Sequence, residues 1–147
     1  MLKIVSITND KQQIISAEWL AKAESVHRQL RPQLPQDYLA RMQEVFANGA
    51  EMAVAAADKE VLGVTVFRIL EKTFCGRELY CDDLVSDEKQ RSKGVGHALM
   101  QYMENICRER GCAVLTLDSG THREQAHKFY FREGLTITSF HFSKRLK

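Results

Sequence analysis

Apolar residues in the first half of the chain recur with two periods, one typical of strands and one typical of helices. Residues 2–7 alternate and are rich in β-branched side chains, which predicts a first strand. Helical spacing then predicts a helix over residues 11–29, and a second helix from Tyr38 that stops at Asn48-Gly49. Alternation after that point predicts three strands, over residues 52–57, 61–70 and 78–85.

The second half of the chain alternates between helix and strand. An apolar stripe over residues 94–110 predicts a long helix that Gly111 ends, and residues 113–117 predict a buried strand. The segment from Thr121 to Glu124 has the form of a capping box, so a helix should begin there and end at Gly134, before a last strand over residues 136–144. The order β-α-α-β-β-β-α-β-α-β predicts a mixed α/β fold in one domain, residues 1–147, with a right-handed crossover between parallel strands.

Composition excludes several classes of protein. The 147 residues are 44% hydrophobic and 27% charged, which is ordinary for a soluble globular domain. A net charge of +2 leaves no electrostatic footprint for nucleic acid, and no apolar run is long enough for a membrane span. The N-terminus is unlike a signal peptide, so we expect a cytoplasmic protein. The four cysteines have neither zinc-finger nor C-x-x-C spacing, so we expect reduced thiols and no metal site.

The segment from Leu84 to His97 is the main candidate for chemistry. A strand ends there, a polar turn follows, and Gly94 and Gly96 open a helix. The N–H groups at a helix N-terminus bind phosphates, and glycine lets a phosphate approach the backbone closely. Arg91 and Lys93 add positive charge. The same spacing also fits a helix that binds no ligand, and G-x-G alone falls short of a dinucleotide-binding fingerprint.

Two motifs in this half of the chain resemble those of GNAT N-acetyltransferases. Residues 91–96 resemble the R-x-x-G-x-G/A motif of that superfamily. One helix and one strand later, Arg123, Ala126, Phe129, Tyr130 and Gly134 resemble its R-x-x-A-x-x-F-Y-x-x-x-G pattern. The C-terminal half also looks like the aminoalkylphosphonate acetyltransferase branch. The resemblance implies a single-domain GNAT-like fold: a twisted, mostly antiparallel sheet with a central parallel strand pair and helices on both faces.

The resemblance also implies how the chain would bind acetyl-CoA, its expected co-substrate. Backbone N–H groups of residues 91–96 would hold the pyrophosphate, and residues 84–86 would pair with the pantetheine arm as another strand does. The N–H of Val85 would donate to the thioester oxygen as it becomes an oxyanion, and Tyr130 would protonate the departing thiolate. The implied binding set is Leu84, Val85, Ser86, Arg91, Ser92, Lys93, Gly94, Val95, Gly96, His97, Ser119 and Phe129.

Two of these positions depart from the family pattern. Ser92 stands where a glycine usually follows the motif arginine, and Ser119 lies in the stretch where many members carry an asparagine. Three others have a plainer interpretation. Tyr130 also fits a core aromatic, Phe129 fits ordinary packing, and His97 fits an exposed side chain.

Three acids on the strand before this segment are candidate bases for the acceptor amine: Glu78, Asp82 and Asp83. Adjacent carboxylates in a partly buried strand are costly and should have raised pKa values. Alternation puts Asp82 and Asp83 on opposite faces unless a bulge intervenes. By the resemblance, Glu78 matches the catalytic glutamate of histone-acetyltransferase relatives and Asp83 an acid common in small-molecule members. We favour Asp83, although the acids also fit a role in binding the substrate cation or in facing solvent.

The sequence therefore predicts an enzyme that moves the acetyl group of acetyl-CoA to a primary amine of a small molecule. Direct transfer in a ternary complex is expected because no cysteine lies in either motif. The catalytic candidates are Tyr130, Asp83, Asp82 and Glu78. Two alternatives stay open: a protein or peptide N-acetyltransferase, and a non-catalytic acyl-CoA-binding module. We expect no nucleic-acid or membrane partner, and a homodimer is left open. The loop of residues 30–35 lies where family members shape the acceptor pocket.

Overall fold

The computed structural model describes residues 1–147 and divides them into two compact units, residues 1–116 and 117–147. The first unit contains, in chain order, β1 (Lys3–Ser6), α1 (Ala17–Leu30), α2 (Tyr38–Ala47), β2 (Ala50–Ala57), β3 (Glu60–Lys72), β4 (Gly76–Ser86), the 3-10 turn η1 (Glu88–Gln90) and α3 (Val95–Arg110). Strand β5 (Val114–Leu117) ends at the boundary, and α4 (Glu124–Arg132) belongs to the second unit. A single domain over the whole chain stays a prediction.

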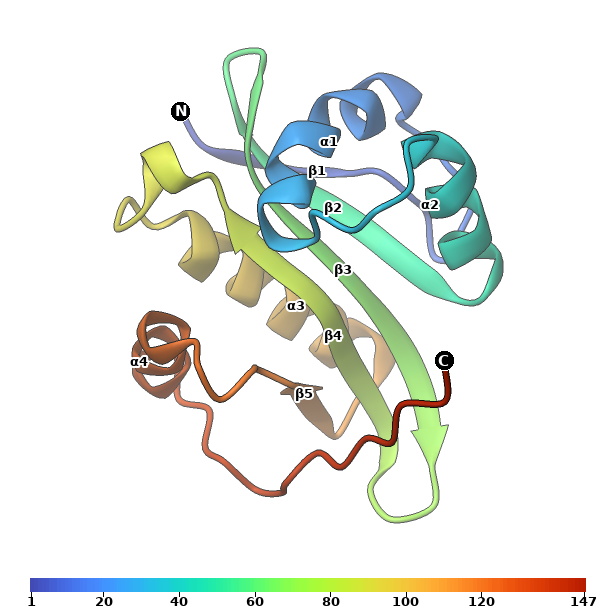
Figure 1. The fold of residues 1–147 in the computed structure, drawn as a ribbon, viewed down its shortest axis with the longest axis vertical. Helices are drawn as coiled ribbons and strands as arrows, with labels where there is room; N and C mark the ends of the chain where they lie inside the picture. Colours follow the sequence, from blue (N-terminus) through green and yellow to red (C-terminus); the bar gives the residue numbers. More distant parts are fainter. The chain divides into compact units, whose positions relative to one another are not determined.

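The sheet has the strand order β1-β2-β3-β4-β5. Strands β1 to β4 pair antiparallel with one another, and β5 runs parallel to β4 after the crossover through α3. Helices α1 and α2 cover one face of this sheet, and α3 covers the other (Figure 1). The predicted mixed α/β fold, with a mostly antiparallel sheet and helices on both faces, is confirmed.

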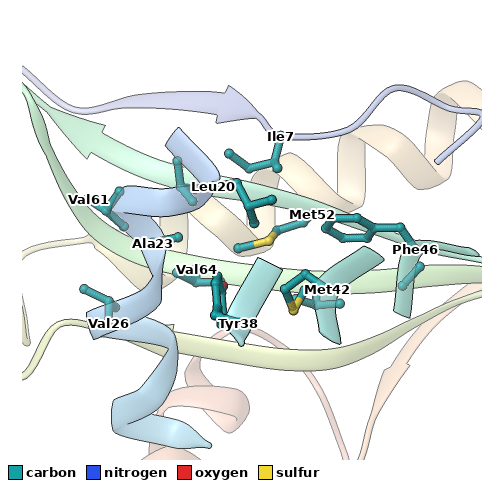
Figure 2. Packing of buried hydrophobic residues seen from close by; sticks show 13 residues of the cluster. Ile7, Leu20, Ala23, Val26, Tyr38, Met42, Phe46, Met52, Val61 and Val64 are labelled. Carbon is teal, nitrogen blue, oxygen red and sulfur yellow. The ribbon is translucent and has the colours of Figure 1, made fainter. Parts of the chain in front are cut away.

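The main core lies between the sheet and the first two helices. Leu20 from α1 and Met42 and Phe46 from α2 are buried against Met52 and Val64 of the sheet (Figure 2). Each such apolar side chain contributes about 1.5–3 kcal/mol relative to an exposed position. The i, i+4 spacing of Met42 and Phe46 is the helical stripe that the sequence predicts.

Gly63 in β3 sets how closely α3 packs on the opposite face. A Cβ atom at this position would lie 2.5 Å from Cγ1 of Val95 and 3.1 Å from the carbonyl oxygen of Val85. The missing side chain therefore lets the first turn of α3 lie directly against the sheet. The start of α3 is thereby fixed beside the end of β4, where residues 84–86 lie.

The expected helix boundaries are partly wrong. Helix α1 begins at Ala17 rather than near residue 11, because residues 8–15 form a loop with a bridge between Thr8 and Ile14. Helix α4 begins at Glu124 with Arg123 as its N-cap and no side-chain cap bond, so the predicted capping box does not form. The helix stop at Gly111 is confirmed, since its φ of +70° is one that glycine adopts without strain.

The last predicted strand is also wrong. No strand forms over residues 136–144, where Ile137, Phe140 and Phe142 are 73%, 84% and 90% exposed. Alternation of apolar and polar residues is a property of one segment, whereas a strand also needs a neighbouring strand to hydrogen-bond its N–H and C=O groups. The parallel pair of β4 and β5 consequently lies at the edge of the sheet rather than at its centre.

None of the helices combines the length and the apolar character that crossing a lipid bilayer requires.

Candidate functional site

A cavity of about 380 Å³ lies on the α1–α2 side of strands β3 and β4. This volume is within the range of sites that hold a small molecule. Its walls come from the end of α1, the loop after it, α2 and the two strands. The lining residues are His27, Arg31, Leu34, Arg41, Met42, Val45, Val66, Arg68, Tyr80, Asp82 and Asp83.

A β-bulge brings the two adjacent acids of β4 into this cavity together. Val66 pairs with Asp83 but the next residue, Phe67, pairs with Cys81, so Asp82 is an extra residue in β4. Simple alternation would put Asp82 and Asp83 on opposite faces of the sheet, and the bulge is the exception that the sequence analysis left open. Both carboxylates line the same cavity as a result.

Asp83 is held by two basic side chains from the end of α1. His27 Nε2 lies 2.7 Å from Oδ2, and Arg31 Nε donates to Oδ1 at 2.7 Å. Burial alone would raise the pKa of Asp83, but the hydrogen bond from His27 and the charge of Arg31 outweigh burial and lower it. The expectation of a raised pKa is wrong for Asp83, because the sequence does not show these partners.

The same contacts fix the imidazole of His27, which is 1% exposed. Its Nδ1 lies 2.8 Å from the hydroxyl of Tyr38. A proton on Nε2 fits these contacts, because Nε2–H can donate to Asp83 while Nδ1 lies within hydrogen-bond distance of the Tyr38 hydroxyl. Burial and the charges of Glu24 and Asp83 raise the pKa of Tyr38, so its hydroxyl keeps its proton.

The other two candidate acids also have firm partners. Arg68 donates to Asp82 from Nε at 3.0 Å and from Nη2 at 2.5 Å, and its Nη1 donates to the carbonyl of Asn48. Glu78 is 2% exposed, accepts a hydrogen bond from Thr116 Oγ1 at 2.7 Å and lies 2.7 Å from Lys72 Nζ. Glu78 is outside the cavity lining, so the structure brings Asp82 and Asp83 together but not Glu78.

Replacing Asp83 with asparagine should destabilise the fold at pH 7 by about 1–3 kcal/mol, because Arg31 and His27 lose a charged acceptor. The native pKa of Asp83 lies below its ordinary value of 3.8, so its contribution is complete above that value. It is lost as the pH falls through the native pKa. Urea unfolding at pH values from 7 to 3 should therefore show that the free energies of unfolding of the wild type and Asp83→Asn converge as the pH falls. Glu60→Gln on the exposed start of β3 is the control. A difference between wild type and Asp83→Asn that stays constant with pH would contradict the stabilisation of ionised Asp83 by His27 and Arg31.

The segment after β4 forms a turn that leads into the uncapped N-terminus of α3. Gly94 is the N-cap of α3 with a φ of +82°, and no side chain caps the helix. The N–H groups of Val95 and Gly96 in the first turn therefore have no intrahelical acceptor. A Cβ on Gly94 would meet nothing within 4 Å, so the space beside it is open. These features suit a phosphate group.

Ser92 shows why glycine is usual at its position. Its φ is +66°, in the left-handed region where a side chain costs roughly 1–2 kcal/mol. Ser92 nevertheless adopts the left-handed conformation that a glycine would adopt without strain. Arg91, Lys93 and His97 lie on the exposed surface of the same turn and first helical turn.

The turn is anchored to both neighbouring elements. The N–H of Asp87 donates to the carbonyl of Leu62 in β3 at 2.8 Å. Gln29 at the end of α1 donates to the Asp87 carboxylate at 3.2 Å and accepts from the N–H of Glu88 at 3.0 Å. The elements that build the cavity therefore also hold the start of the turn.

Residues 84–86 lie between the acids and this turn. Leu84 packs with Val95 and Leu99 on the α3 side, and Val85 packs with the core on the α1–α2 side. Ser86 pairs with Gly63 at the end of β4. Cys81, which precedes the acids, is 2% exposed, and burial raises the pKa of its thiol to about 12.

The remaining candidates lie in the second unit. Phe129 and Tyr130 are half-buried neighbours on α4, with ring centroids 5.6 Å apart in an edge-to-face arrangement. Ser119 precedes α4, and its hydroxyl has no hydrogen-bond partner within the protein. Their roles toward a co-substrate stay predictions.

Sequence reasoning missed the basic residues around the acids, which are His27, Arg31, Arg41 and Arg68. His27 follows Val26 on the buried stripe of α1 and reads as ordinary packing. Its partner Asp83 lies 56 residues away, so no local spacing relates the two. The bulge that turns Asp82 inward also has no signal in the strand sequence.

Comparison with known proteins identifies relatives over most of the chain. The model of the acetyltransferase (GNAT) family matches residues 13–134. An uncharacterized N-acetyltransferase of Bacillus subtilis (strain 168), YhdJ, is 31% identical over 139 residues, which are 90% of this chain and 96% of that protein. Aminoalkylphosphonate N-acetyltransferase of Salmonella typhimurium is 33% identical over 64 residues, which are 44% of this chain and 42% of that protein.

A third relative matches in both sequence and structure. Glucosamine 6-phosphate N-acetyltransferase of Arabidopsis thaliana is 26% identical over 110 residues, which are 71% of this chain and 72% of that protein. A crystal structure of the enzyme of that name from the same plant superposes with a TM-score of 0.75 and 20% identity, covering 100% of this chain and 99% of that one. At that identity the superposition shows the shared fold.

Proposed function

We propose that this chain, which belongs to the GNAT acetyltransferase family and is an acetyl-CoA-dependent N-acetyltransferase, acetylates the primary amine of a small molecule. The proposed reaction is direct transfer in a ternary complex. The cavity of about 380 Å³ beside Asp82 and Asp83 is the observation that carries the proposal. Two relatives are named for small amines, glucosamine 6-phosphate and aminoalkylphosphonates, which supports the same class of acceptor.

The wall formed by the loop after α1 supports a small acceptor rather than a peptide. Arg28 donates from Nη1 to the carbonyl of Leu34 and from Nη2 to the carbonyl of Pro35, both at 2.7 Å. These bonds hold the loop in place, and Leu34 lines the cavity. A fixed wall gives a pocket of limited size, whereas a peptide substrate needs a groove that continues past the reacting amine.

Acetyl-CoA would supply the activated acetyl group as a thioester. The N–H groups of Val95 and Gly96 would hold its pyrophosphate, with Arg91 and Lys93 adding positive charge. Residues 84–86 would pair with the pantetheine arm, which would direct the N–H of Val85 toward the thioester oxygen. The unpartnered hydroxyl of Ser119 is suited to a contact with the same arm.

Tyr130 would donate its hydroxyl proton to the departing thiolate. The ordinary pKa of tyrosine, about 10, is higher than the roughly 8.5 of a thiol. Position must therefore compensate for a weak acid, as the placement of general acids commonly does. Phe129 would pack beside Tyr130 and hold its ring, in keeping with their edge-to-face contact.

The state of Cys81 supports direct transfer. Its buried thiol has a pKa raised to about 12, so it stays protonated at neutral pH. A thiol is a nucleophile only as its thiolate. Cys81 is therefore unsuited to carry an acetyl group, although it lies on β4 just before the two acids.

The contacts of the three acids favour positioning over proton abstraction. Asp83 has a lowered pKa, and Asp82 accepts hydrogen bonds from Arg68, so neither carboxylate is well suited to take a proton from the amine. Glu78 is buried away from the cavity. We assign Asp82 and Asp83 to binding the acceptor amine and the water molecule that takes up the proton of that amine. An acidic limb of the kcat/KM profile that disappears in Asp83→Asn would instead return Asp83 to the role of base.

Initial rates of CoA release, with acetyl-CoA and an accepted amine both varied, test direct transfer. A ternary complex should give intersecting lines in double-reciprocal plots, and the protein should carry no acetyl group after incubation with acetyl-CoA alone. Parallel lines together with an acetylated protein would show a covalent route and contradict the proposal. A cytoplasmic location and a homodimer remain predictions from the sequence.

A further inference from the structure

The charges around the cavity are unequal. Three arginines line it, Arg31, Arg41 and Arg68, against two carboxylates, Asp82 and Asp83. Counted over the arginines and carboxylates alone, the lining carries one positive charge in excess. The cavity is therefore not an acidic pocket, although two adjacent acids contribute to it.

Arg41 is the lining arginine whose ion-pair partner, Glu44, lies outside the cavity lining. Arg31 donates a hydrogen bond to Asp83 at 2.7 Å, and Arg68 donates to Asp82 through two nitrogens. Arg41 on α2 has a longer contact, 3.5 Å to Glu44, and both of those side chains are about half exposed or more. An exposed pair at this distance contributes little, so the Arg41 guanidinium is the one that can turn to a ligand at low cost.

Apolar side chains line the cavity together with Arg41 and the acids. Met42 and Val45 on α2, Leu34 from the preceding loop and Val66 on β3 line the same cavity. An acceptor in this cavity would have a carboxylate pair for its amine and Arg41 for a second, anionic group. A second ammonium group would meet the guanidinium of Arg41 instead, and both carboxylates of the lining already accept hydrogen bonds from arginines.

We propose that the acceptor is a small amine that also carries an anionic group, a phosphate, phosphonate or carboxylate, which Arg41 binds while the amine lies beside Asp82 and Asp83. A guanidinium binds such groups through two parallel hydrogen bonds, which a single ammonium cannot reproduce. The inference rests on the proposed function, since it assigns the substrate class of the same cavity.

Three amines of equal chain length test the charge preference: 3-aminopropylphosphonate, 3-amino-1-propanol and 1,3-diaminopropane. We expect kcat/KM for the phosphonate to be at least about tenfold above that for the alcohol, the effect of one charge-assisted hydrogen bond. The diamine should be the poorest acceptor. A diamine accepted as well as the phosphonate, or better, would overturn the inference while leaving the proposed function intact. Failure to acetylate any of the three would count against both.

Variants of Arg41 then assign the preference to this residue. Arg41→Gln should reduce the phosphonate-to-alcohol ratio of kcat/KM about tenfold, mainly through the KM of the phosphonate. Arg41→Lys should restore part of the ratio, because it returns the charge without the paired bonds. Arg108→Gln on the exposed side of α3 is the matched control and should leave the ratio unchanged. An Arg41→Gln ratio equal to that of the wild type would overturn the role of Arg41.

Discussion

Replacing Tyr130 with phenylalanine is expected to lower kcat by about 10²–10⁴-fold, the contribution of a general acid to such a step. The change removes one hydroxyl and keeps the ring that contacts Phe129, so the fold and the affinity for acetyl-CoA should change little. Single-turnover rates of CoA release at saturating acetyl-CoA measure the effect.

Tyr102→Phe provides the matched control for this loss. Its hydroxyl lies 3.0 Å from Ser6 Oγ, between α3 and β1, so the same chemical change is made away from the cavity. Its kcat should stay close to that of the wild type. If Tyr130→Phe also keeps kcat within about twofold, the hydroxyl has no role in proton transfer and Tyr130 is a packing residue.

Replacing Gly94 with glutamate is expected to abolish the protection that acetyl-CoA gives against thermal unfolding. In the wild type, a ligand at a hundred times its Kd stabilises the native state by about 2.7 kcal/mol. In the variant, a carboxylate would occupy the open space beside the first turn of α3 and repel the pyrophosphate. Thermal melts with and without acetyl-CoA measure the difference.

Gly76→Glu separates this effect from backbone strain. Gly76 at the start of β4 has a φ of +79°, against +82° for Gly94, and a Cβ there also meets nothing within 4 Å. Both variants should therefore lose similar stability in the absence of ligand. Gly76→Glu should keep the full protection by acetyl-CoA. Equal protection of the two variants would remove the phosphate-binding assignment of residues 91–96.

Local sequence signals were sufficient to predict most of the fold. The stripe through Leu99 and Met103 and the stop at Gly111 place α3, and alternation places the strands to within a few residues. These signals work because one buried face is enough to set the period of a helix or strand. The segment at 136–144 has the same alternation but no partner strand, and pairing is a property of the fold rather than of the segment.

The turn between β4 and α3 was also predictable, because Gly94 and the start of a helix are adjacent in the sequence; its binding of phosphate stays a prediction. The cavity beside Asp82 and Asp83 was not predictable. Its geometry depends on a one-residue bulge at Asp82 and on basic side chains from α1 and β3 that meet the acids only after folding. The sequence suggested that these adjacent acids are bases with raised pKa values. In the structure each is paired with an arginine, and Asp83 has a lowered pKa.

The most direct test of the account is to identify the product. The protein would be incubated with acetyl-CoA and a panel of small primary amines, and mass spectrometry would follow the acetylated amine and free CoA together. The account predicts equal amounts of N-acetylated amine and CoA, formed only when both substrates are present. Binding of acetyl-CoA without acetylation of any amine, or CoA release without an acetylated amine, would contradict it.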